Sequence, residues 1–189
     1  MTPSSARGGY GTLRRRLFPA LTAALAVASS APSAAPEPLR PTYDATGALR
    51  RPPGIDRWIM VGASLGLGYS DATEDGPGRF HRVYLEPGAY DHYRRTGAFP
   101  DGTMLALTIR HPARRVPPSR AGWTEGDLVA VEMAVKDRSR FPGSWAYFDF
   151  GTSATVARAI APERCANCHA EHAARDHVFV QFYPQLRER

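Results

Sequence analysis

Lysine, cysteine and long apolar runs are all scarce in this sequence of 189 residues. Its 24 basic residues include a single lysine, Lys136, and its two cysteines, Cys165 and Cys168, lie three positions apart. Because there is no second cysteine pair, a structural zinc site made of two well-spaced ligand pairs is disfavoured. The glycine-rich stretch 65–78 lacks the G-x-G-x-x-G spacing, which excludes a nucleotide-phosphate loop.

The longest apolar run lies near the N-terminus. Arg14–Arg16 precede a run rich in leucine and alanine, residues 17–28, which ends in the small residues Ala26–Ala28. A positive region, a short apolar region and small residues in this order predict a signal peptide over residues 1–28, cleaved between positions 28 and 35. We therefore expect an exported, periplasmic protein, and an uncleaved membrane anchor is the alternative.

The predicted signal peptide also changes the charge balance. Four arginines and no acidic residue lie within it, so the net charge falls from +6 for the whole chain to +2 for the mature one. The high overall pI of the sequence therefore gives no support to a nucleic-acid partner.

Both cysteines belong to the motif Cys165-Ala-Asn-Cys168-His169, which has the C-x-x-C-H spacing of covalent haem c attachment. Two thiols must add to the two vinyl groups on one haem edge, and an imidazole must reach the iron. On a helix these three side chains share one face. The motif predicts one haem c, attached through the two cysteines, with His169 as the iron ligand. Three alternatives stay open: a zinc site supplemented by His172 and His177, a redox dithiol, and a structural disulfide.

The remaining pattern predicts an α+β fold dominated by an antiparallel sheet, with one or two helices and a C-terminal helix or loop that carries the haem motif. Residues 29–55 are proline-rich and predict an extended lead-in, followed by a single haem c domain over residues 56–189. A helix is expected from Glu86-Pro87 to Gly97. Strands are expected at 57–62, 80–85, 103–109, 127–135, 144–150 and 177–183, with a proline- and arginine-rich loop up to about residue 126.

Several segments together resemble the cytochrome P-460 family, including its cytochrome c′-beta branch. The resemblance covers the mature chain and rests on segments 57–62, 80–84, 96–103, 135–142, 145–148, 165–169 and 177–184. It implies a mostly β protein, usually a homodimer, with one haem c per subunit and an open or weakly occupied sixth iron site. It also implies either hydroxylamine oxidation or binding of small gases such as nitric oxide.

The resemblance makes the scarcity of lysine relevant to how the haem is attached. Hydroxylamine-oxidising members of the family cross-link a lysine to the haem, from the strand that corresponds here to residues 103–109. The matching position is Leu107, which the resemblance places among the haem-binding residues, whereas Lys136 matches a different part of the family pattern. The sequence therefore predicts a haem without this third covalent bond.

The distal side of the haem is predicted by resemblance to draw on the strands at 80–84, 103–109 and 127–135. His81 is a candidate to hydrogen-bond an iron-bound ligand, or else a histidine on the sheet surface. Glu132 is a candidate proton relay if it is buried, or else a solvated carboxylate. His172 is predicted to be a surface or supporting histidine, and His177 a hydrogen-bonding or capping residue.

The expected function is binding of nitric oxide or a related nitrogen oxide at the open iron site, with or without redox turnover and an unidentified periplasmic redox partner. One alternative is an electron carrier with a histidine or methionine as sixth ligand, for which Met60, Met104 and Met133 are candidates, although core packing is the default for all three. The other alternative is a hydroxylamine-oxidising enzyme.

Overall fold

The computed structural model describes residues 39–68 and 76–187. The predicted signal peptide and the first part of the lead-in lie outside these residues. Within the described ranges, no helix has both the length and the apolar character needed to span a membrane. The predicted fold class is confirmed: an antiparallel sheet dominates, and two helices accompany it.

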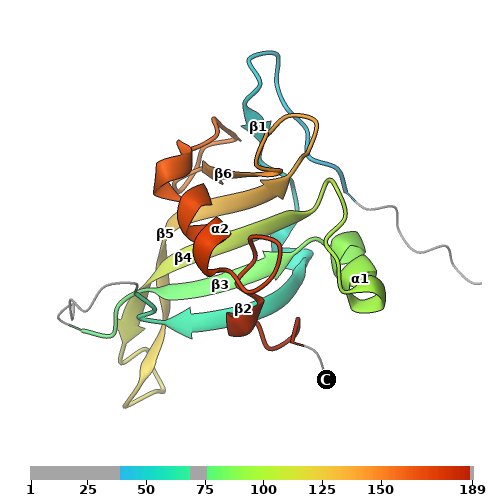
Figure 1. The fold of residues 1–189 in the computed structure, drawn as a ribbon. Helices are drawn as coiled ribbons and strands as arrows, with labels where there is room; N and C mark the ends of the chain where they lie inside the picture. Colours follow the sequence, from blue (N-terminus) through green and yellow to red (C-terminus); the bar gives the residue numbers. More distant parts are fainter. Residues whose placement is uncertain (1–38, 69–75, 188–189) are drawn as a thin grey trace, which may run out of the picture. The chain divides into compact units, whose positions relative to one another are not determined.

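Five strands form the sheet, in the order β2-β3-β4-β5-β6, so each strand pairs with its neighbour in sequence (Figure 1). A second, two-stranded sheet pairs β1 with β7. The strands are β1 (Leu49–Arg50), β2 (Ile59–Leu65), β3 (Phe80–Leu85), β4 (Met104–Arg114), β5 (Trp123–Lys136), β6 (Trp145–Asp149) and β7 (Val156–Ala157). Three short 3-10 helices complete the fold: η1 (Ile55–Arg57), η2 (Pro162–Arg164) and η3 (Val180–Phe182).

The central hairpin is longer than predicted. About half of the proline- and arginine-rich segment expected to be a loop is strand, because β4 extends to Arg114 and β5 begins at Trp123, and these two residues still pair. Two register shifts around Arg110 and Pro112 accommodate the proline, which has no amide hydrogen to donate to the ladder.

The helix α1 (Pro87–Thr96) forms where its end signals predict it. The Glu86 carboxylate accepts a hydrogen bond from the Ala89 amide at 2.8 Å, and Pro87 takes the first helical position. Gly97 ends the helix at a φ of 70°, a left-handed conformation that glycine adopts without a Cβ clash. Local chemistry therefore determines both ends of α1.

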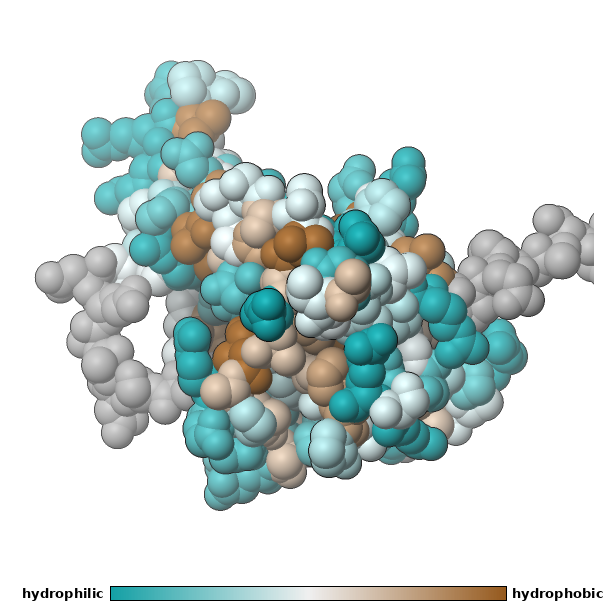
Figure 2. Space-filling model, turned by 90° about the horizontal axis from the view of Figure 1, so that it is seen from above, coloured by the Kyte–Doolittle hydropathy of each residue, from teal (hydrophilic) through white to brown (hydrophobic). Residues whose placement is uncertain are grey.

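Alternating side chains place a separate hydrophobic cluster on each face of the sheet. One face carries Met104, Ala106 and Val131 and packs against Leu49 and Ile55 of the N-terminal segment. The other face packs against the helix α1 and the C-terminal segment through a cluster comprising Val61, Leu85, Ala89, Tyr93, Phe99, Leu105, Trp145, Tyr147, Val178 and Leu186. On the surface in Figure 2, small groups of hydrophobic side chains lie near the centre, with hydrophilic ones around them.

The strand predicted at 177–183 is wrong. Asp176 and His177 both have positive φ angles, of 45° and 60°, and η3 follows at Val180–Phe182. The apolar residues of this segment reach the interior from a turn: Val178 and Phe179 are 3% and 5% exposed. The segment has the apolar residues of a buried strand because it is buried, and burial does not require pairing with a sheet.

Candidate functional site

The Cys165–His169 motif lies at the start of a short helix, α2 (Ala166–His172), in front of the five-stranded sheet (Figure 1). The segment before it contains β7 and η2, so the motif does not follow directly on a strand as in a redox dithiol of βαβ context. The His169 amide donates to the Cys165 carbonyl at 3.1 Å. This turn brings Cys165 and His169 to the same side, and Cys168 lies directly before His169 on α2.

The imidazole of His169 is held in a defined orientation. Its Nδ1 lies 2.8 Å from the carbonyl oxygen of His177. A carbonyl can only accept, so Nδ1 carries the proton, and the lone pair lies on Nε2. The rings of Tyr147 and Phe179 pack against the imidazole at centroid distances of 4.4 and 4.6 Å. This arrangement, with one nitrogen anchored and the other free to bind, is the usual one for a metal-ligating histidine.

Burial supports the neutral form of this imidazole. Desolvation lowers the pKa of His169 below its usual value of 6.5, and the hydrogen bond to His177 opposes this only in part. A neutral imidazole is the form that binds iron.

The two cysteines are available for covalent attachment. Both are partly exposed, and neither takes part in a disulfide. Burial raises the pKa of the Cys165 thiol, and the nearby Glu132 carboxylate raises it further. In the part of the chain that the structure describes, no group of three or more His, Cys, Asp or Glu side chains is placed to hold a metal ion.

A pocket opens between α2, the C-terminal turn and the sheet. It contains about 670 Å³ of space when the part open to solvent is counted. Cys165, His169, His177, Phe179 and Tyr183 line one side. Nδ1 of His177 is buried there without a hydrogen-bond partner, so a polar group within the pocket would complete its bonding. Cys165, His169 and the apolar walls of the pocket fit a haem, and Cys168, the second thiol of the motif, lies beside His169 on α2 outside the residues that line the pocket.

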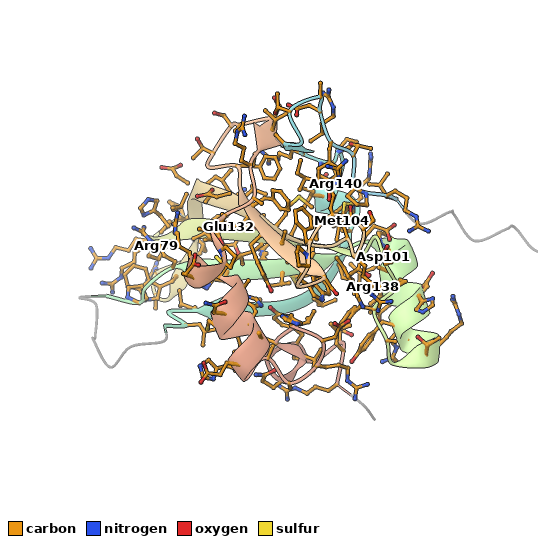
Figure 3. The ribbon with its side chains drawn as sticks, turned by 45° about the horizontal axis from the view of Figure 1, so that its top comes forward. Arg79, Asp101, Met104, Glu132, Arg138 and Arg140 are labelled. Carbon is orange, nitrogen blue, oxygen red and sulfur yellow. The ribbon has the colours of Figure 1, made fainter. Side chains whose placement is uncertain are left out.

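The sheet forms the opposite wall of this pocket. Val83, Leu107 and Glu132 lie directly beside one another across β3, β4 and β5 in the strand register, and all three line the pocket. Glu132 lies on the sheet next to α2 (Figure 3). Burial raises the pKa of its carboxyl group, and the neighbouring Asp149 adds to the increase. The structure thus brings Glu132 and Leu107 together with the Cys165–His169 motif.

His81 lines a smaller adjoining hollow rather than this pocket. The hollow shares Val83, Leu107 and Tyr183 with the larger pocket and continues past them to His81 and Gly62. A Cβ on Gly62 would lie 2.6 Å from the Tyr183 ring, so the glycine allows the C-terminal segment to approach β2 closely. Burial lowers the pKa of His81. This histidine therefore lies near the predicted site, in a hollow that Leu107 shares with the pocket.

The other candidate iron ligands lie elsewhere. His172 is exposed, with its Nε2 3.8 Å from the Glu171 carboxylate. Met60 is 48% exposed. Met104 and Met133 are buried in the hydrophobic cluster on the other face of the sheet, although Met133 also borders the pocket floor. These positions favour core packing for the two buried methionines.

Four aromatic residues of the site were not predicted as site residues. Tyr147, Phe148, Phe179 and Tyr183 line the pocket, and Tyr147 and Phe179 contact His169. The aromatic residues in segments 144–150 and 177–183 were the available signal, but an apolar run does not distinguish a cofactor wall from an ordinary core.

Comparison with protein families gives one match. The family model described as Cytochrome P460 matches residues 53–180, which is more than half of the chain and includes α2, β2–β6 and the Cys165–His169 motif. No curated protein matches the chain.

Proposed function

Because the chain belongs to the cytochrome P460 family, which implies haem c, we propose that it is an exported mono-haem c protein that binds nitric oxide or a related nitrogen oxide. Cys165 and Cys168 would form the thioether links, and His169 would bind the iron through Nε2. Haem iron supplies a coordination site for a small ligand and one-electron redox chemistry. The N-terminal sequence pattern supports a periplasmic location, and the family resemblance supports a homodimer.

The observation that carries this proposal is the hydrogen bond from His169 Nδ1 to the His177 carbonyl. It leaves one nitrogen free, in a pocket that also contains Cys165 and faces an apolar wall. Across the pocket, Val83 and Leu107 supply apolar side chains to the wall that faces His169. A small, weakly polar molecule is the kind of ligand that such a wall favours.

Glu132 supplies a proton-holding group on the same wall. Because its pKa is raised, its carboxyl group keeps a proton to a higher pH than a solvated glutamate does. It can therefore give a proton to, or take one from, a nitrogen oxide bound in the pocket. His81 lines the adjoining hollow rather than this pocket, so Glu132 is the better placed of the two to share a proton with a ligand bound there.

The positions of Leu107 and Lys136 favour ligand binding over hydroxylamine oxidation. Leu107 lines the pocket at the position that the resemblance matches to the cross-linking lysine, and it has no amine to offer. The Lys136 ammonium donates at 2.6 Å to Asp176 and at 2.7 Å to the Phe99 carbonyl, and Lys136 does not line the pocket.

Absorption spectroscopy of the purified holoprotein tests the proposal. We expect a five-coordinate, high-spin ferrous spectrum that changes on addition of nitric oxide or carbon monoxide. His169→Ala should abolish this spectrum, whereas His172→Ala, which changes an exposed histidine three residues away, should retain it. A six-coordinate, low-spin ferrous protein that responds to neither gas would overturn the proposal.

A further inference from the structure

The single lysine of the chain is buried outside the haem pocket, at the end of β5. Lys136 is 2% exposed, and its ammonium donates to the Phe99 carbonyl and to Asp176 Oδ2, with the Trp145 ring centroid 6.0 Å away. A buried ammonium is costly unless it is paired and hydrogen-bonded. Lys136 meets this condition through its two partners, which its ammonium holds at the end of β5.

Asp176 is held by two donors from two strands. Lys136 of β5 binds Oδ2 at 2.6 Å, and the indole nitrogen of Trp145 in β6 donates to Oδ1 at 3.1 Å. Both carboxylate oxygens are therefore tied to the sheet. Moving the Asp176 carboxylate away from the sheet would break a charge-assisted hydrogen bond.

The turn that contains Asp176 adopts an unfavourable backbone conformation. Asp176 and His177 are successive non-glycine residues with positive φ, a conformation in which the Cβ approaches the following carbonyl oxygen. Such residues persist where the surroundings determine their conformation. The Val178 amide closes the turn on the Arg175 carbonyl at 2.8 Å, and the Arg175 guanidinium donates to the Gly97 carbonyl at 2.9 Å.

This turn presents the carbonyl group that orients His169. The residue after Asp176 is His177, whose oxygen accepts the proton of His169 Nδ1 at 2.8 Å. A chain of contacts thus runs from the Lys136 ammonium through the Asp176 carboxylate and one peptide unit to the imidazole. A hydrogen bond to Nδ1 makes a ligating imidazole more basic and its metal more electron-rich.

We propose that Lys136 is a positioning residue for the haem iron, which it controls through Asp176 and the left-handed turn 175–178. By holding the His177 carbonyl on His169, it sets the electron donation of the imidazole and thereby the reduction potential. The inference rests on the proposed function in one respect: His169 must be the iron ligand.

Two substitutions test it in the holoprotein. Lys136→Met removes the ammonium and keeps a long side chain, and Asp176→Asn removes the charge but keeps the shape. In both, the hydrogen bond on Nδ1 should weaken, so resonance Raman of the ferrous protein should show a lower iron–histidine stretching frequency. The ferrous-to-ferric ratio at a fixed potential should rise about tenfold, which corresponds to a rise of about 59 mV for one electron. In Lys136→Arg, which retains the charge, the stretching frequency and the reduction potential should both lie closer to the wild-type values.

A matched control separates positioning from stability. Leu49→Ala empties a fully buried site on the other face of the sheet, so it should destabilise the protein while leaving the stretching frequency and potential unchanged. If Lys136→Met yields no folded protein, Trp145→Phe provides the test instead, since it removes the second donor to Asp176. It should lower the stretching frequency and raise the reduction potential by smaller amounts.

The outcomes are distinguishable. Unchanged frequency and potential in the folded variants of Lys136, Asp176 and Trp145 would overturn the inference and leave the proposed function standing. A wild-type ferrous protein with no iron–histidine band would refute both, because its iron would then not be five-coordinate with His169 as the ligand.

Discussion

At the scale of single residues, Glu132 links the sheet to the chemistry of the pocket. Its carboxyl group lies beside Val83 and Leu107, and burial together with Asp149 raises its pKa above the usual value of 4.5. Between these two pKa values the folded protein binds more protons at this site than the unfolded one. The free energy of unfolding should therefore fall as the pH rises from about 4.5 through the raised folded pKa, and no further above it.

Glu132→Gln should remove this contribution. Urea unfolding of wild type and variant, followed at a series of pH values from about 4 to about 8, measures it. We expect the difference in stability to shift in favour of the variant as the pH rises. Parallel curves for the two proteins would contradict a raised pKa. Glu163→Gln, which changes an exposed carboxylate in η2, is the control and should leave the curve unchanged.

At the scale of elements, the first turn of α1 depends on one buried carboxylate. Glu86 is 5% exposed, and it accepts hydrogen bonds from the Ala89 amide at 2.8 Å and the Leu39 amide at 3.1 Å. Glu86→Ala leaves both donors without this partner and should lower the free energy of unfolding by about 0.5–2 kcal/mol. Chemical denaturation measures the loss. Glu86→Gln, which keeps a side-chain oxygen as acceptor, should lower the free energy of unfolding by less. Equal decreases in the two variants would contradict a stabilising role for these hydrogen bonds.

At the scale of the whole molecule, the five-stranded sheet separates two hydrophobic clusters. Phe150 is 1% exposed in the cluster that faces away from α2. Phe150→Ala should therefore lower the free energy of unfolding by about 3–5 kcal/mol because of the cavity it leaves. The haem absorption spectrum of the folded variant should match that of wild type. An altered spectrum would show that the sheet transmits repacking from one face to the other.

Features with short-range causes could be predicted from the sequence. The Cys165–His169 spacing is imposed by the attachment chemistry, and the Glu86-Pro87 and Gly97 signals act within one helical turn. The strand pattern indicated an antiparallel sheet because side chains alternate between its two faces. Even so, the length of the β4–β5 hairpin was underestimated. The register shifts in its proline- and arginine-rich part interrupt the regular alternation of side chains by which a strand is predicted.

Features that depend on distant partners came only from the tertiary structure. The segment 177–183 read as a strand, yet its backbone turns at Asp176 because that carboxylate binds Lys136 and Trp145, 40 and 31 positions away. The same turn orients His169. The sequence alone thus determined that the chain has a haem-attachment motif with a histidine beside it. The tertiary structure decided which carbonyl orients that histidine and what faces it across the pocket, because those contacts join residues that only folding brings together.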